Sequence, residues 1–196
     1  MRRLLVRLLV LSLSLSISLP VSAAWDLPQL MDLLARTKSG RARFVETRYL
    51  AVLDKPLVAS GEMSFVAPDR LEKRTLSPRP ETVRLDKDRL TIERGGRQST
   101  IDLAGQPLAQ AFVASTRAAL TGDRATLEKH YGLHLAGDRE QWTLTLLPSD
   151  QAIANLVQRI TIKGQRNRVL SIDTLQADGD RSLLAIQPLI QPLSDQ

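Results

Sequence analysis

Alternation of apolar and polar residues, interrupted by short turns, is the feature that most constrains the fold of this chain. It extends over residues 41–103, and in SGEMSFV (60–66) it places Met63 and Phe65 on one face of an extended segment and polar residues on the other. A period of two indicates β-strands. Turns as short as Gly95-Gly96 join antiparallel strands, because parallel strands need long crossovers. This part of the chain is therefore predicted to be an antiparallel sheet.

Helical spacing replaces the alternation in two places. We expect a first helix that begins at the N-cap Asp26 and is stopped by Gly40. A second should start near Pro107 and end before Gly122, followed by a short helix capped by Asp123. Further strand patterns follow to the end. The sequence predicts an α+β fold: an open, curved antiparallel half-barrel of about ten strands, with helices as a lid over an apolar cavity.

The first 24 residues have the anatomy of a secretory signal peptide. A positive start (MRRLLVR) precedes an apolar run (LLVLSLSLSIS) and an end with small residues (LPVSAA). The apolar run is shorter and richer in serine than the roughly 20 apolar residues of a membrane-spanning helix, which makes an uncleaved anchor the weaker alternative. We expect cleavage after Ala24 and a single domain over residues 25–196.

Composition excludes several classes of function. The chain has no cysteine, which rules out thiol nucleophiles, cysteine metal sites and a lipidated cysteine. Its formal net charge of +6 comes partly from the arginines of the expected signal peptide, and acidic and basic residues are interleaved elsewhere. A mixed surface on an exported protein does not favour nucleic acid as a partner.

No set of residues points to catalysis, a metal or a cofactor. His130 and His134 are the two histidines, but Gly132 lies between them at an expected helix-to-strand junction, where a spacing of four no longer places both on one face. The chain has no G-x-S-x-G motif and no phosphate-binding loop. We therefore expect a protein that is not an enzyme, with a hydrolase of acyl esters as an alternative.

Three segments carry a resemblance to a known family. They are FVETRYL, PLVASGEMSFVAPDRLEKRT and LSPRPETVRLDKDRLTI, and with the helices and later strands in order they cover residues 25–188. In this order they resemble the LolA-like periplasmic lipoprotein carriers. The resemblance implies a soluble carrier with an apolar cavity that shields the acyl chains of a lipoprotein or lipid and delivers it towards the outer membrane. It also implies a monomer in the periplasm, with an inner-membrane release protein and an outer-membrane acceptor as partners.

Three departures from the family pattern indicate an offshoot. Glu46 stands where these carriers often have glutamine, Ala67 stands where a basic residue before the proline holds the lid, and residues 72–74 (EKR) replace an aromatic residue. These changes leave a second function open. In that alternative, a sensor or adaptor uses the same pocket to report lipid state to a membrane protein.

The resemblance places apolar strand residues on the cavity wall. Water-exposed acyl chains cost about 0.8 kcal/mol per methylene, which a wall of aliphatic side chains offsets. The expected cavity residues are Phe44, Met63, Phe65, Leu71, Leu85, Leu90, Ile92, Trp142, Leu144, Leu146, Ile160 and Ile162, and the expected lid residues are Leu108, Phe112 and Val113. An ordinary β-sheet core is the alternative for each. The charges of residues 70–74 are expected on the outer face or the rim.

Overall fold

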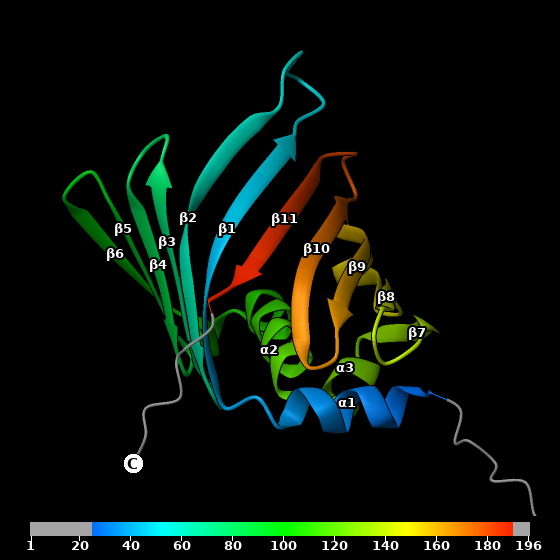
Figure 1. Ribbon diagram of the computed structural model, residues 1–196. Helices are drawn as coiled ribbons and strands as arrows, with labels where there is room; N and C mark the ends of the chain where they lie inside the picture. The colour runs from blue at the N-terminus through cyan, green and yellow to red at the C-terminus, as the bar shows by residue number, and fades with distance from the viewer. Residues whose placement is uncertain (1–24, 190–196) are drawn as a thin grey trace, which may run out of the picture.

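The computed structural model describes residues 25–189, which form one antiparallel sheet and a few helices (Figure 1). The expected signal peptide, residues 1–24, lies outside the described residues. The helices are α1 (Leu27–Ala35), the 3-10 turn η1 (Leu103–Gly105), α2 (Pro107–Thr121), α3 (Arg124–Glu128) and α4 (Gln151–Ala154). The strands are β1 (Ser39–Tyr49), β2 (Leu57–Val66), β3 (Arg70–Ser77), β4 (Glu81–Asp86), β5 (Arg89–Arg94), β6 (Arg97–Asp102), β7 (Tyr131–Gly137), β8 (Trp142–Pro148), β9 (Val157–Gln165), β10 (Arg168–Gln176) and β11 (Arg181–Pro188).

The sheet has two halves that meet at β1. The strand order is β6-β5-β4-β3-β2-β1-β11-β10-β9-β8-β7, so the first and last strands pair at the centre. In Figure 1 the sheet curves around α2, and α1 and α3 lie with it on the concave side. The predicted α+β class and open antiparallel sheet are confirmed, with eleven strands in residues 25–189 rather than about ten.

The helix boundaries agree with the sequence except at one end. Asp26 caps α1 through a bond from the Gln29 amide to its Oδ1, at 3.0 Å. The helix ends at Ala35, and the expectation that Gly40 stops it is wrong. The physical reason is strand pairing, because Gly40 already belongs to β1 and lies opposite Phe65 of β2. Gly122, with φ of 70°, ends α2 as expected, since glycine adopts this left-handed conformation without a Cβ clash.

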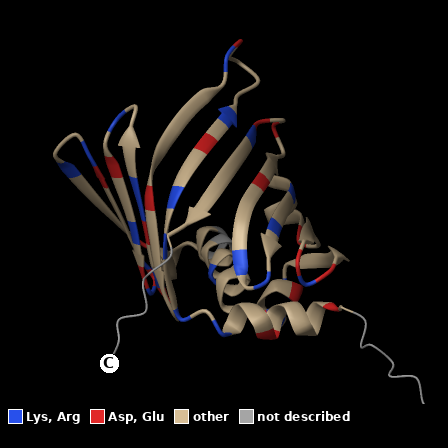
Figure 2. Cartoon of the chain, viewed as in Figure 1, with Lys and Arg blue, Asp and Glu red and all other residues tan. Residues whose placement is uncertain are grey.

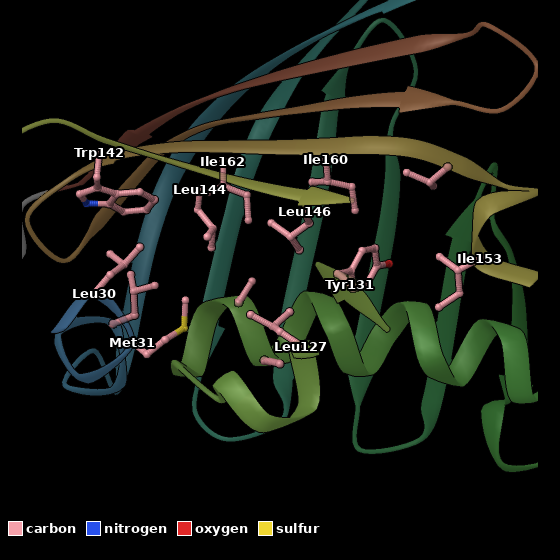
Figure 3. Close-up of a cluster of buried hydrophobic side chains, with 14 residues drawn as sticks. Leu30, Met31, Leu127, Tyr131, Trp142, Leu144, Leu146, Ile153, Ile160 and Ile162 are labelled. Atoms are coloured by element: carbon pink, nitrogen blue, oxygen red, sulfur yellow. The ribbon is translucent and has the colours of Figure 1, made fainter. Parts of the chain in front are cut away.

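The main core lies between the helices and the second half of the sheet. Figure 3 shows side chains from β8 and β9 pointing towards those of the helices, for example Leu144 towards Leu127. The buried cluster consists of Leu30, Met31, Leu34, Ala118, Ala119, Leu127, Tyr131, Trp142, Leu144, Leu146, Ile153, Val157, Ile160 and Ile162. Burying each large apolar side chain contributes about 1.5–3 kcal/mol, so this half supplies most of the hydrophobic stabilisation.

None of the helices within residues 25–189 is long and apolar enough to cross a membrane. Charged side chains of both signs are spread over the strands and turns (Figure 2), without a large region of one sign. The mixed surface expected from the sequence is therefore present in the described part of the chain.

Candidate functional site

Strand register places the twelve expected cavity residues on one face of the sheet. Phe65 pairs with Leu71, Leu71 with Leu85 and Leu85 with Leu90, which gives one apolar row across β2 to β5. A parallel row runs from Met63 through Lys73 and Val83 to Ile92. In the other half, Leu144 pairs with Ile162 and Leu146 with Ile160. Directly paired residues point to the same side of a sheet. The members on β8 and β9 point towards the helices, so this side is the concave face.

Burial separates these residues into two groups. Trp142, Leu144, Leu146, Ile160 and Ile162 belong to the helix-covered core and are buried. The Trp142 indole also donates from Nε1 to the Arg166 carbonyl at 2.8 Å, which is a structural contact. In the first half, Phe44 and Leu85 are buried, whereas the remaining residues are only half-buried. Together with Val83, which is also half-buried and lies in the same rows, we call this set the open face: Met63, Phe65, Leu71, Val83, Leu90 and Ile92.

One end of the open face is covered by α2. A cavity of about 10 Å³ lies between Phe65, Leu71 and Leu85 of the sheet and Thr116, Arg117 and Leu120 of the helix. This volume holds about one water, whereas ligand pockets usually measure about 300–1,000 Å³. In the described arrangement α2 therefore closes this end of the face.

Arg117 joins α2 to the sheet. Its Nη2 donates to the carbonyl of Lys87, in the turn between β4 and β5, at 2.5 Å. Of the expected lid residues, Val113 is half-buried on α2, and the side chains of Leu108 and Phe112 lie outside the described residues. Leu120 belongs to the apolar stripe that the sequence indicates for this helix, but Thr116 and Arg117 were not among the expected lid residues. A spacing of three to four residues from Val113 leads to both of them.

An ion pair lies on the concave face, and its lysine stands within a row of the open face, between Met63 and Val83. Lys73 Nζ donates to Glu46 Oε2 at 2.5 Å, and the Ser182 hydroxyl donates to Glu46 Oε1 at 2.9 Å. The side chains are 29% exposed for Lys73 and 17% for Glu46. Lys73 Nζ also lies 4.9 Å from the centroid of the Phe44 ring. The expectation that the charges of residues 70–74 all lie on the outer face or the rim is therefore wrong for Lys73.

The surroundings of Glu46 keep it ionised. Burial by itself raises the pKa of Glu46, but the hydrogen bond and charge of Lys73, the Ser182 hydroxyl and the charge of Arg48 together hold this pKa below its ordinary value. The concave face thus carries a charged pair at neutral pH, where an apolar wall would carry none.

Small residues of β2 make room for this pair. Glu46 on β1 and Lys73 on β3 reach each other across β2, where Ala59 pairs with Glu46 and Gly61 pairs with Phe44. The backbone of β3 approaches Gly61 closely, because a Cβ added there would lie 2.0 Å from the Arg74 carbonyl oxygen. Only glycine fits this position without a shift of the strands.

The opposite face of the first half carries the other charges. Arg84 donates to Glu72 at 2.9 Å and to Glu93 at 3.4 Å, between exposed side chains of β3, β4 and β5. These residues are out of phase with Leu71 and Leu85, so here the expected outer position is correct. A hollow of about 430 Å³ lies at β1, β2, β3 and β11, with exposed Val45 and Leu76 in its lining.

Within residues 25–189 no group of three or more histidine, cysteine, aspartate or glutamate side chains is arranged to hold a metal ion. His130 precedes β7 and His134 lies within it; the junction between helix and strand falls at residues 129–130, and Gly132 already belongs to β7.

Comparisons with known proteins give one family and several similar folds. A family model described as outer membrane lipoprotein carrier protein LolA-like matches residues 20–187. Among solved structures, the Pseudomonas aeruginosa MucA/MucB complex is similar at 19% identity and a TM-score of 0.50, covering 87% of this chain and 60% of that one. A structure of MucB is similar at 20% identity and a TM-score of 0.50, covering 85% and 60%.

A LolA superfamily protein from Nitrosomonas europaea is similar at 10% identity and a TM-score of 0.44, covering 86% of this chain and 93% of that one. This chain thus spans about 60% of the length of the MucB chains that it matches. No curated protein matched the sequence.

Proposed function

Because the chain belongs to the LolA-like family of outer membrane lipoprotein carrier proteins, we propose that it is a periplasmic carrier of acyl chains. The open face would shield the chains of a lipoprotein or lipid during its delivery towards the outer membrane. The expected partners are an inner-membrane release protein and an outer-membrane acceptor. Export by the N-terminal signal peptide is part of the same proposal.

One observation carries this proposal: half of the concave face is apolar but not filled. The helices bury the concave residues of β8 and β9 in the second half, whereas the open face keeps six half-buried apolar residues across β2 to β5. Apolar surface that the fold leaves partly uncovered is available for a ligand.

The helix α2 is proposed as the lid. The closed cavity beneath it, of about 10 Å³, is too small for an acyl chain, so a chain that binds there must displace the helix. In this mechanism the Arg117 bond to the Lys87 carbonyl holds the lid in the closed position, in place of the basic residue that Ala67 replaces.

The proposal is tested with protein purified from the periplasm. Native mass spectrometry and lipid extraction should find bound acyl species, and the purified protein should retain a fluorescent fatty-acyl probe. Transfer of cargo between two membranes in a reconstituted assay would identify a carrier. Protein that is always empty and does not retain the probe would contradict the proposal.

A second candidate is an adaptor that reports lipid state to a membrane protein. The likeness to MucB, which was solved in complex with MucA, supports it at the level of the fold. The hollow beside Val45 and Leu76 offers apolar surface to a protein partner on the other side of the sheet. Cross-linking in cells distinguishes the two candidates, because an adaptor should be captured on one membrane protein and need not hand cargo on.

A further inference from the structure

We propose that Lys73 binds the anionic group of the cargo, a carboxylate or a phosphate, and that Glu46 is the counter-ion that Lys73 contacts when no cargo is present. This inference rests on the proposed function, because it assumes that acyl chains lie on the open face.

The position of Lys73 supports this assignment. It lies in register between Met63 and Val83, in the middle of one apolar row of the open face. An amphiphile whose chains cover the neighbouring row, from Phe65 to Leu90, would bring its polar end within reach of this ammonium group. With 29% of the side chain exposed, Lys73 is accessible from the open side.

The chemistry of the pair also points to a ligand. Placing two charges on an apolar face costs desolvation energy, and apolar residues at both positions would serve a purely hydrophobic wall equally well. An ammonium group carries three N–H donors, and the bond to Glu46 uses one of them. Lys73 can therefore donate to a second anionic group while it stays bonded to Glu46, or it can leave Glu46 and donate to that group instead.

The sign of the ligand follows from the charges around Glu46. Lys73 is bonded to this carboxylate, and Arg48, which pairs with Ser182 on the same face, also acts on it electrostatically. Two cations thus surround one anion. An anionic group gains from the excess positive charge, whereas a cationic group would be repelled.

The test compares probes that share one tail. A fluorescent fatty acid is measured against its methyl ester, and phosphatidate against diacylglycerol. The wild-type protein should bind each anionic probe about tenfold or more tightly than its neutral partner, as expected for a charge-assisted hydrogen bond. Lys73→Met should lose this preference but keep the ester. Glu46→Gln should bind the acid more tightly, because it removes the competing carboxylate.

Arg74→Met is the matched control. Arg74 is the next residue of β3, is exposed, and lies on the opposite face, so its loss should leave both preferences unchanged. The double variant Glu46→Gln/Lys73→Met leaves neither charge unpaired and serves if Lys73→Met alone does not fold, as judged by thermal unfolding. It should bind the ester as wild type does and show no preference for the acid.

The probe measurements separate a failure of the anion site from a failure of acyl binding. Equal binding of acid and ester by the wild type, or an undiminished preference in the Lys73 variants, would overturn the anion site while acyl binding stands. Failure to bind either probe would refute the proposed function itself. Inorganic phosphate and phosphatidate are then compared, at equal concentrations, as competitors of the fluorescent fatty acid. Displacement by inorganic phosphate identifies free phosphate as the ligand, and displacement by phosphatidate alone identifies the lipid headgroup.

Discussion

Replacing Arg117 by methionine should release α2 from the sheet. The guanidinium is the group of α2 that donates to the Lys87 carbonyl, at 2.5 Å, and its apolar stem helps to line the small cavity with Phe65 and Leu71. Methionine keeps much of the apolar stem and removes the donor. The substitution therefore separates the hydrogen bond from the packing.

The size of the effect follows from the surroundings of this bond. A hydrogen bond with a charged partner contributes about 1.5–3 kcal/mol net. Arg117 is half-buried and Lys87 is exposed, so the lower end of this range applies. A loss of about 1.5 kcal/mol, if it falls on lid closure, raises the population of the open lid about tenfold.

Hydrogen exchange of the α2 amides, measured by mass spectrometry, reports this opening directly. Exchange should accelerate by about the same factor in Arg117→Met, and an acyl probe should enter faster. Arg124→Met is the control, because Arg124 makes only an exposed pair with Glu128 within α3. Unchanged exchange in α2, together with unchanged probe uptake in a folded variant, would refute the idea that this bond holds the lid.

Three further predictions test the sheet. Gly61→Ala should lower the free energy of unfolding by about 2 kcal/mol or more in chemical denaturation, because its Cβ would lie 2.0 Å from the Arg74 carbonyl oxygen; an unchanged midpoint would contradict this. Trp142→Phe should lower thermal stability by removing the bond to the Arg166 carbonyl, with acyl-probe retention preserved; lost retention at full stability would instead assign Trp142 to the cargo site. Glu46→Gln should destabilise the protein by about 1–3 kcal/mol at neutral pH, between the values for exposed and buried pairs. Because the pKa of Glu46 is lower in the folded than in the unfolded protein, its contribution to stability is complete above the unfolded pKa of about 4.3. The advantage of wild type over Glu46→Gln should shrink as the pH falls below that value and disappear once the pH passes the folded-state pKa. A difference in stability that does not depend on pH would exclude the ion pair as its source.

Much of the fold could be predicted because its signals are local. Alternation identified the strands, and the caps Asp26 and Asp123 and the stop at Gly122 identified helix ends. Each depends on a few neighbouring residues. The end of α1 was wrong because Gly40 has the properties of a helix stop but is also acceptable in a strand, and pairing with β2 decides between them.

The candidate site could be predicted only in part, because alternation shows which residues share a face but not what covers it. Phe65 and Leu144 have the same pattern in the sequence, yet Leu144 is buried under the helices and Phe65 is half-buried beside α2. The position of the helices depends on contacts between distant parts of the chain. No local pattern contains that information.

The concave position of Lys73 follows from the alternation of residues 70–75. In RLEKRT the alternate residues Leu71, Lys73 and Thr75 must share a face, so once Leu71 is assigned to the concave side Lys73 follows. The same phase joins Glu46 to Phe44 on β1. The many charges of this segment favoured the outer face as their expected place, although alternation by itself puts two opposite charges on one apolar face.

The two halves of the concave face explain how one sheet can be stable and still offer apolar surface to a ligand. A domain of this size has a net stability of only about 5–15 kcal/mol, so apolar surface cannot be left uncovered unless other packing compensates. Here the helices bury the concave residues of β8 and β9 in the second half, and the pairing of β1 with β11 joins the open half to the second half directly. Substitutions in the core should therefore change stability first, whereas those on the open face should change binding first. Glu46 lies next to β11 at the boundary between these halves and bonds Lys73 of the open face across β2, so a polar group of a ligand can be held there without disturbing the core.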